Sequence, residues 1–221
     1  MVATRFEDLA EQVYRTLRDM ILAGELVPGQ KLIQEALSER LGVSRTPLLA
    51  AFSKLEKEML VELVPRRGAF VKRLSPGELL QLYEVRLRLE PLGASEAARQ
   101  LDKKGRQLLD ELLASYREAV IAGEPQAIRM ADYRFHMAIM KLSGNTVLER
   151  ILSSFAIVSK SNQRGLMKAA DKSLEEHEAL RDAIISGNAE LSERIMREHL
   201  TEARDNAARI LAMESRNKAS A

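Results

Sequence analysis

Residues 32–60, LIQEALSERLGVSRTPLLAAFSKLEKEML, carry a helical pattern of apolar residues that is broken once, at Gly42. Leu41 closes the first expected helix, and Gly42 supplies a tight turn. Ser44 can cap a second helix, with Pro47 in its first turn, where a missing N–H costs nothing. Two helices joined by so short a turn predict a helix-turn-helix unit, whose second helix enters the major groove of DNA.

A basic hairpin is expected directly after this unit. The sequence VELV-PRRG-AFVKR predicts two short strands around Arg66, Arg67 and Gly68, which together form a wing. Residues 63–73 contain four basic side chains and no acidic one. Such a patch suits contacts with DNA phosphates, which give salt-dependent affinity. A solvated turn is the alternative for the patch alone, and the helices beside it favour DNA binding.

Length and composition exclude several classes of protein. A chain of 221 residues can form two small domains, each with its own core. Hydrophobic residues make up 46% and charged residues 30%, which is typical of a soluble globular protein. The chain has no cysteine, no apolar run of about 20 residues and no signal-peptide core at its amino terminus. We therefore expect no disulfide or thiolate site, no membrane partner, and a cytoplasmic location.

The chain divides into two expected domains. We predict a mostly α protein, with a winged helix-turn-helix domain at 6–73, a linker at 74–77 and an all-α antiparallel bundle at 78–214. We expect a disordered tail at 215–221. Ser75 can cap the first bundle helix, and Pro91 is expected to kink it. Helices are expected at 6–23, 76–100, 103–122, 125–142, 146–167, 172–186 and 189–213, separated by Gly, Asn and Pro punctuation.

All three histidines of the chain, His136, His177 and His199, lie on apolar stripes of different bundle helices. Asp132 precedes His136 by four residues, so both side chains project from one helix face. They can be unrelated core histidines bonded to backbone, but their combination favours a metal site for Zn, Ni, Mn or Fe. Four such ligands can close a tetrahedral structural site, or leave two octahedral positions for water or a chelating ligand.

Arg86 shares a helix face with apolar Leu82 and Leu89, where a buried guanidinium needs an anionic partner. That partner can be Glu90, four residues later. It can equally be the carboxylate of a bound ligand, held in bidentate geometry. The sequence leaves both alternatives open.

Several stretches resemble a known family. LGVSRTP, followed by KLEKEMLVELVPRRGAFV, resembles the amino-terminal domain of GntR-family bacterial transcription regulators. YEVRLRLEPLGASEAARQL, DYRFH, SGNTVLERIL, EEHEALRDAI and REHL resemble the FCD effector domain of that family's FadR-type branch. The resemblance covers residues 10–205. It implies a winged helix-turn-helix joined to a helical bundle that binds a small effector, usually a carboxylic acid.

The resemblance assigns roles to particular residues. In metal-binding members an Asp and three His hold the ion, and these positions are matched by the metal quartet, Asp132, His136, His177 and His199. The implied DNA contacts are Ser44, Arg45 and Thr46 on the second helix, and Arg67 and Gly68, with Arg66 beside them, in the wing. We expect the effector to contact Arg86 and Asn162.

One departure concerns Leu49, which occupies a position where the family usually has a DNA-contacting Arg. Leucine can touch a thymine methyl but cannot pair with guanine, so the operator or the affinity should differ. The chain also carries the metal quartet that the acyl-CoA-binding member of the branch lacks, so an acyl-CoA effector is not expected.

The expected protein is a homodimeric repressor or activator, not an enzyme. Its binding to a palindromic DNA operator is expected to respond to a small carboxylate bound with the metal. A metal sensor, in which the ion itself is the signal, is the first alternative. The second is a metal-dependent hydrolase with an appended DNA-binding module, although no H-E-x-x-H motif or evident nucleophile supports it.

Overall fold

The computed structural model describes residues 2–161 and 168–219. The chain divides into two compact units, which consist mainly of the residues before and after the Arg73–Leu74 bond. The amino-terminal unit is a winged helix-turn-helix and the second is a helical bundle, as predicted. Within the described ranges, no helix combines the length and apolar character needed to cross a lipid bilayer.

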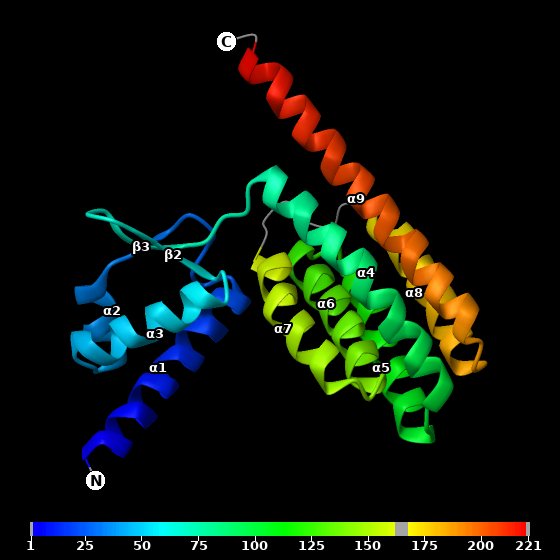
Figure 1. Cartoon of the computed structure of the whole chain (residues 1–221), viewed down its shortest axis with the longest axis horizontal. Helices are drawn as coiled ribbons and strands as arrows, with labels where there is room; N and C mark the ends of the chain where they lie inside the picture. Colours follow the sequence, from blue (N-terminus) through cyan, green and yellow to red (C-terminus); the bar gives the residue numbers. More distant parts are fainter. Residues whose placement is uncertain (1, 162–167, 220–221) are drawn as a thin grey trace. The chain divides into compact units, whose positions relative to one another are not determined.

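The amino-terminal unit contains three helices and a small sheet (Figure 1). The sheet has the order β1-β3-β2 and is antiparallel throughout. The wing strands β2 and β3 were predicted, whereas β1 was not. It pairs with β3 through Lys31 opposite Phe70. The elements are α1 (Val2–Ala23), β1 (Lys31–Leu32), α2 (Gln34–Leu41), α3 (Arg45–Lys57), β2 (Val61–Val64) and β3 (Gly68–Val71).

The turn between α2 and α3 depends on Gly42. Its backbone is left-handed, with φ 65° and ψ 33°, a conformation that glycine adopts without the steric cost of a Cβ atom. The Gly42 N–H donates to the Glu39 carbonyl at 3.2 Å and closes α2. Ser44 has the extended backbone of an N-cap, but its side chain makes no capping hydrogen bond, contrary to our expectation. The conformation of the turn therefore depends on Gly42 and not on a side-chain cap at Ser44.

The core of this unit lies between α1, α3 and the sheet. The side chains of Leu17, Leu48, Phe52, Leu55 and Leu60 are completely buried. Leu17 lies on α1, and Leu48, Phe52 and Leu55 lie along one side of α3, as expected for an amphipathic helix. The opposite side of α3 is left exposed to solvent.

The second unit consists of six helices in the described residues (Figure 1). α4 packs along α9, α5 against α6, and α8 against α9. No strand occurs in the described part of this unit, in agreement with the sequence pattern. The helices are α4 (Pro76–Gln100), α5 (Lys103–Ala122), α6 (Pro125–Leu142), α7 (Thr146–Ser161), α8 (Ala170–Ile185) and α9 (Ala189–Ala219).

The start of α4 was predicted from local sequence, whereas the end of α9 was not. Ser75 forms a capping box with Glu78, in which each side chain binds the backbone N–H of the other. α4 then continues through Pro91 as far as Gln100. α9 extends to Ala219, into the segment for which we expected disorder.

Candidate metal centre and nucleic-acid interface

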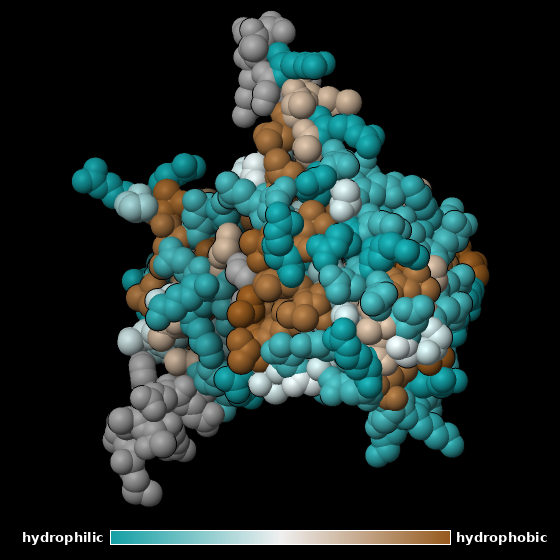
Figure 2. Space-filling view, turned by 45° about the vertical axis from the view of Figure 1, so that its right-hand side comes forward, coloured by the Kyte–Doolittle hydropathy of each residue, from teal (hydrophilic) through white to brown (hydrophobic). Residues whose placement is uncertain are grey.

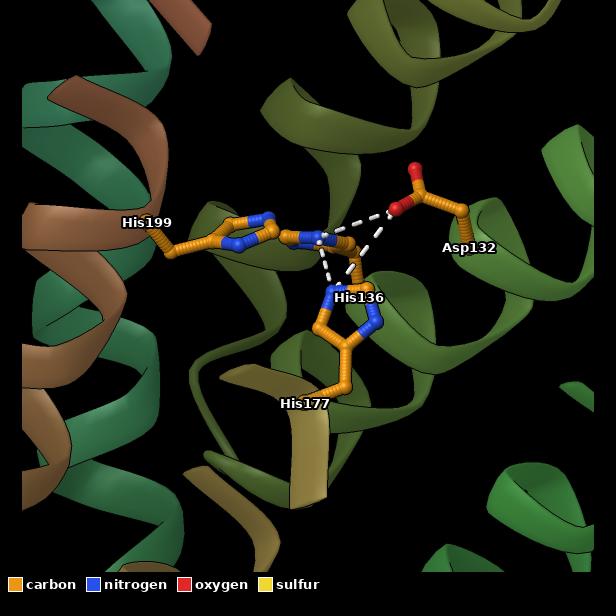
Figure 3. A group of neighbouring side chains, drawn as sticks. All are labelled: Asp132, His136, His177 and His199. Atoms are coloured by element: carbon orange, nitrogen blue, oxygen red, sulfur yellow. Dashed lines mark hydrogen bonds and ion pairs between the residues drawn. The ribbon is translucent and has the colours of Figure 1, made fainter. Parts of the chain in front are cut away.

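The four residues of the metal quartet come together inside the bundle (Figure 3). Asp132 and His136 lie one turn apart on α6, His177 lies on α8, and His199 lies on α9. Each residue offers one ligand atom, and these atoms all lie within 4.8 Å of one another. A set of three imidazole nitrogens and one carboxylate oxygen suits Zn, Ni, Mn or Fe.

The centre is shielded from water. His177 is completely buried, and His136 and His199 are 4% and 5% exposed. Burial, together with the neighbouring His199 and His136, lowers the pKa of His177 well below its usual value. Burial also lowers the pKa of His199, and it raises the pKa of Asp132. Both imidazoles are therefore held in the neutral form that can donate a lone pair to a metal.

Glu90 on α4 orients His136. Its Oε2 lies 2.6 Å from His136 Nδ1, so the Nδ1–H donates to the carboxylate and Nε2 is left for a metal. Arg86 binds the same carboxylate through Nε and Nη2. Burial alone would raise the pKa of Glu90, but Arg86 and His136 outweigh it and keep the pKa below its usual range. Glu90 is thus a buried anion that the Arg86 guanidinium and the His136 imidazole stabilise.

Glu176 on α8 plays the corresponding part for His199. Its Oε2 lies 2.6 Å from His199 Nδ1, which again leaves Nε2 available. Lys168 binds the Glu176 carboxylate and also donates to the His199 carbonyl at 2.9 Å. The side chain of Lys168 is 4% exposed. Two imidazoles of the quartet are therefore fixed in the same tautomer by separate carboxylates, of which Glu90 is buried and Glu176 is 23% exposed.

His177 lacks this support. Its Nε2 lies 3.1 Å from His136 Nε2, and its Nδ1 is buried without a hydrogen-bond partner. Because Nδ1 of His136 donates to Glu90, the Nε2 atoms of His136 and His177 meet with at most one proton between them. Asp132 Oδ1 lies 3.8 Å from His136 Nε2 and 3.7 Å from His177 Nε2. A cation at this point would be bound by all of these lone pairs, so the residues present fit a metal ion.

A small pocket with a volume of about 20 Å³ adjoins the quartet. Arg86 pairs with Glu90, the first of the two partners considered for it. It also lines this pocket, and the second partner, a bound carboxylate, stays a prediction. Burial raises the pKa of Tyr83 to about 12, so its hydroxyl stays neutral. Asn162, the other expected effector contact, lies outside the described residues. The pocket is lined by Tyr83, Arg86, Asp132, Lys168, Ser173, His199, Leu200 and Ala203.

The sequence did not predict the roles of three residues that support the histidines, Glu90, Glu176 and Lys168. Glu90 was considered only as a partner of Arg86, and Glu176 and Lys168 were not considered. Glu176 stands directly before His177 in the sequence, yet its carboxylate contacts His199, 23 residues further on. No local spacing predicts that contact, because it depends on how α8 packs against α9.

The residues expected to contact DNA lie on the surface of the amino-terminal unit. Ser44, Arg45 and Thr46 are exposed at the start of α3. Arg45 Nη2 donates to Glu35 Oε1 on α2 at 2.7 Å, in an exposed ion pair that water screens. The first residues of the recognition helix are thus accessible to a base edge.

The wing turn carries the remaining expected contacts. Arg66, Arg67 and Gly68 are exposed, and Arg66 and Gly68 have positive φ values of 64° and 100°. The guanidinium carbon of Arg67 lies 5.7 Å from the centre of the Phe70 ring.

In Figure 2 hydrophilic residues cover most of the visible face, and hydrophobic ones gather in a few patches.

Comparison with known proteins matches each of the two units to a protein family. Residues 9–71 match the family of bacterial regulatory proteins called the gntR family, and residues 81–202 match the FCD domain. The chain is 30% identical over 217 residues to an uncharacterized HTH-type transcriptional regulator in an unstable DNA locus of Streptomyces ambofaciens, which covers 96% of this chain and 90% of that protein. It is 29% identical over 211 residues to the HTH-type transcriptional regulator LutR of Bacillus subtilis, covering 84% of this chain and 95% of LutR.

A solved structure shows the same fold. The chain superposes on a putative GntR transcriptional regulator from Rhodococcus sp. RHA1 with a TM-score of 0.79 at 23% sequence identity, covering 90% of this chain and 97% of the other.

Proposed function

Because this chain belongs to the GntR family of bacterial transcription regulators and carries an FCD domain, we propose that a small organic acid controls its binding to DNA. The acid would bind in the helical bundle together with a divalent metal ion held by the metal quartet. The observation that carries this proposal is the convergence of four ligand atoms within 4.8 Å beside a pocket that Arg86 and Lys168 line.

The metal, when bound, would act as a Lewis acid for carboxylate oxygens. Arg86 would bind a second anionic or carbonyl group of the same molecule. Its guanidinium has five N–H donors, and Glu90 engages only Nε and Nη2. Di- and tricarboxylates have such groups, and hydroxy acids and sugar acids have hydroxyl oxygens that can accept from the same N–H donors, whereas a fatty acyl chain has neither. The buried cations offset the cost of transferring the acid's charge into a largely apolar bundle.

Control of DNA binding requires the acid to favour one arrangement of two DNA-binding units. We propose that the protein acts as a homodimer on a palindromic operator, because two-fold symmetry in the protein is matched by two-fold symmetry in the site. Arg45 and Thr46 would contact base edges, and Arg66 and Arg67 would contact phosphates. The acid would then act as the signal, and the metal as a fixed part of its binding site.

The test uses the full-length protein and an operator selected from random double-stranded DNA. Metal content is measured by elemental analysis, and operator binding by fluorescence anisotropy in chelated and Zn²⁺-loaded protein. Each form is titrated with lactate, succinate, citrate and gluconate. We expect at least one of these acids to change operator affinity in the loaded protein only, and His177→Ala to abolish both metal retention and the response.

Two other outcomes would contradict the proposal. A change of operator affinity on adding Zn²⁺, with no effect of any acid, would identify a metal sensor. Full metal retention and acid response in His177→Ala would show that the metal quartet is not the site. Arg86→Lys keeps a positive charge but loses the planar fork, so it should retain metal while weakening acid binding.

A further inference from the structure

A leucine is exposed on the side of α3 that faces away from the core. Leu49 is 47% exposed, whereas Leu48 beside it is completely buried. Leu49 follows Arg45 by one helical turn and Thr46 by three residues, so these three side chains share one face of the helix. The face that carries the expected base contacts therefore also carries a large apolar side chain.

Leu49 is not an isolated apolar residue. It borders an open hollow of about 420 Å³ between α3 and the β2–β3 hairpin. Leu63 of β2, which is 39% exposed, stands on the other side of the hollow, and Phe52 is also among its lining residues. Arg66 lines the hollow at the wing turn. Two exposed leucines and one basic side chain therefore border the same hollow, beside the helix face that carries the expected base contacts.

The chemistry of this surface identifies its occupant as duplex DNA. The chain is a DNA-binding regulator, and α3 is the second helix of its helix-turn-helix. That helix lies in the major groove, and Arg45 and Arg66 carry the charge that complements phosphates. The one apolar group that base edges present in this groove is the C5-methyl of thymine.

We propose that Leu49 reads this methyl group, so that each operator half-site requires a thymine opposite the second turn of α3. The leucine side chain has no donor or acceptor. A guanine at this position would therefore leave its O6 and N7 acceptors desolvated without a partner. Leu49 would thus select a T·A pair by apolar contact and reject a G·C pair by leaving that pair's polar groups unsatisfied.

The experiment removes the methyl group from the DNA and the side chain from the protein. An operator is selected with the full-length protein from random duplex DNA, and each thymine is then replaced singly by deoxyuridine, which lacks only the C5-methyl. Wild type, Leu49→Ala and Leu49→Met are titrated against each duplex by anisotropy. Val27→Ala, which truncates an exposed apolar residue of the same unit outside the hollow, is the matched control.

We expect one thymine in each half-site whose replacement weakens wild-type binding by about fourfold, the value for one buried methyl-sized group. Replacement in both half-sites should weaken it by roughly 15-fold. Val27→Ala and Leu49→Met should keep this sensitivity, and Leu49→Ala should lose it while melting at the wild-type temperature. Repeating the selection with Leu49→Arg should replace this T·A pair by G·C, because arginine binds guanine through two hydrogen bonds.

Two results would overturn the proposal. Wild-type binding that tolerates deoxyuridine at every thymine would show that no methyl is read. Equal sensitivity in wild type and Leu49→Ala would assign the contact to another residue. Leu49→Met guards against a folding defect, since a variant with a similar apolar side chain must retain the same pattern.

Discussion

Replacing Glu90 by Gln should destabilise the bundle and weaken metal binding together. The substitution keeps the shape of the side chain but removes a charge that is 4% exposed and that Arg86 and His136 share. Arg86, itself 8% exposed, would then be a buried cation without a counter-ion. Removing one partner of a buried ion pair costs about 3–5 kcal/mol, so the free energy of unfolding should fall by this amount.

The loss of metal affinity has a separate cause. A neutral amide oxygen accepts the His136 Nδ1–H more weakly than a carboxylate, so it fixes the tautomer less firmly and leaves Nε2 less basic. Loss of such an orienting partner lowers metal affinity by about 10- to 100-fold. Urea unfolding of the chelated protein, followed by circular dichroism, measures the first effect. Competition with a chelator of known Zn²⁺ affinity measures the second.

Two variants control this experiment. Asp110→Asn removes a carboxylate that Arg181 contacts at 2.7 Å on the bundle surface, and it should cost less than about 1 kcal/mol. Arg86→Met combined with Glu90→Gln removes both charges and should be more stable than Glu90→Gln alone. The reasoning is refuted if Glu90→Gln unfolds within about 1 kcal/mol of wild type and binds Zn²⁺ equally well.

Three further outcomes are expected. Glu35→Gln should strengthen operator binding by up to about fivefold in anisotropy titrations, because it frees Arg45 from an exposed ion pair. Chelated protein should lose stability as the pH falls below 6.5, since His177 and His199 have lowered pKa values and take up protons first in the unfolded chain. Urea unfolding at pH 7.5 and 5.5 should show that loss, at up to about 1.4 kcal/mol per pH unit for each group. Gly42→Ala, which forces a Cβ atom into a left-handed backbone, should lower stability by about 1–2 kcal/mol in the same assay.

The sequence by itself determined the elements whose causes are local. The break at Gly42 and the capping box at Ser75 depend on residues within four positions of each other, so both were predictable. The same holds for the placement of Asp132 and His136 on one face of α6, which follows from helical periodicity. The winged helix-turn-helix and the bundle were therefore predicted correctly as architectures.

Local sequence was less informative at the ends of elements. It suggested a cap at Ser44 that the side chain does not form, and a disordered end where α9 continues to Ala219. Strand β1 was missed because two residues show no alternation, and their pairing exists only where the chain meets β3. These features are decided by neighbours that are distant in sequence.

Only the tertiary structure decided how the candidate metal centre is supported. The contact of Glu90 with His136 spans 46 residues, and that of Glu176 with His199 spans 23. Neither carboxylate is distinguishable in the sequence from the many solvated glutamates on helix surfaces. Packing buries Glu90 and leaves Glu176 partly exposed. A buried carboxylate needs a nearby donor, because a charge without a partner is costly in a low-dielectric interior. The four residues of the quartet could thus be predicted from their chemistry and their positions on apolar helix faces. Their geometry depends on which helices pack together.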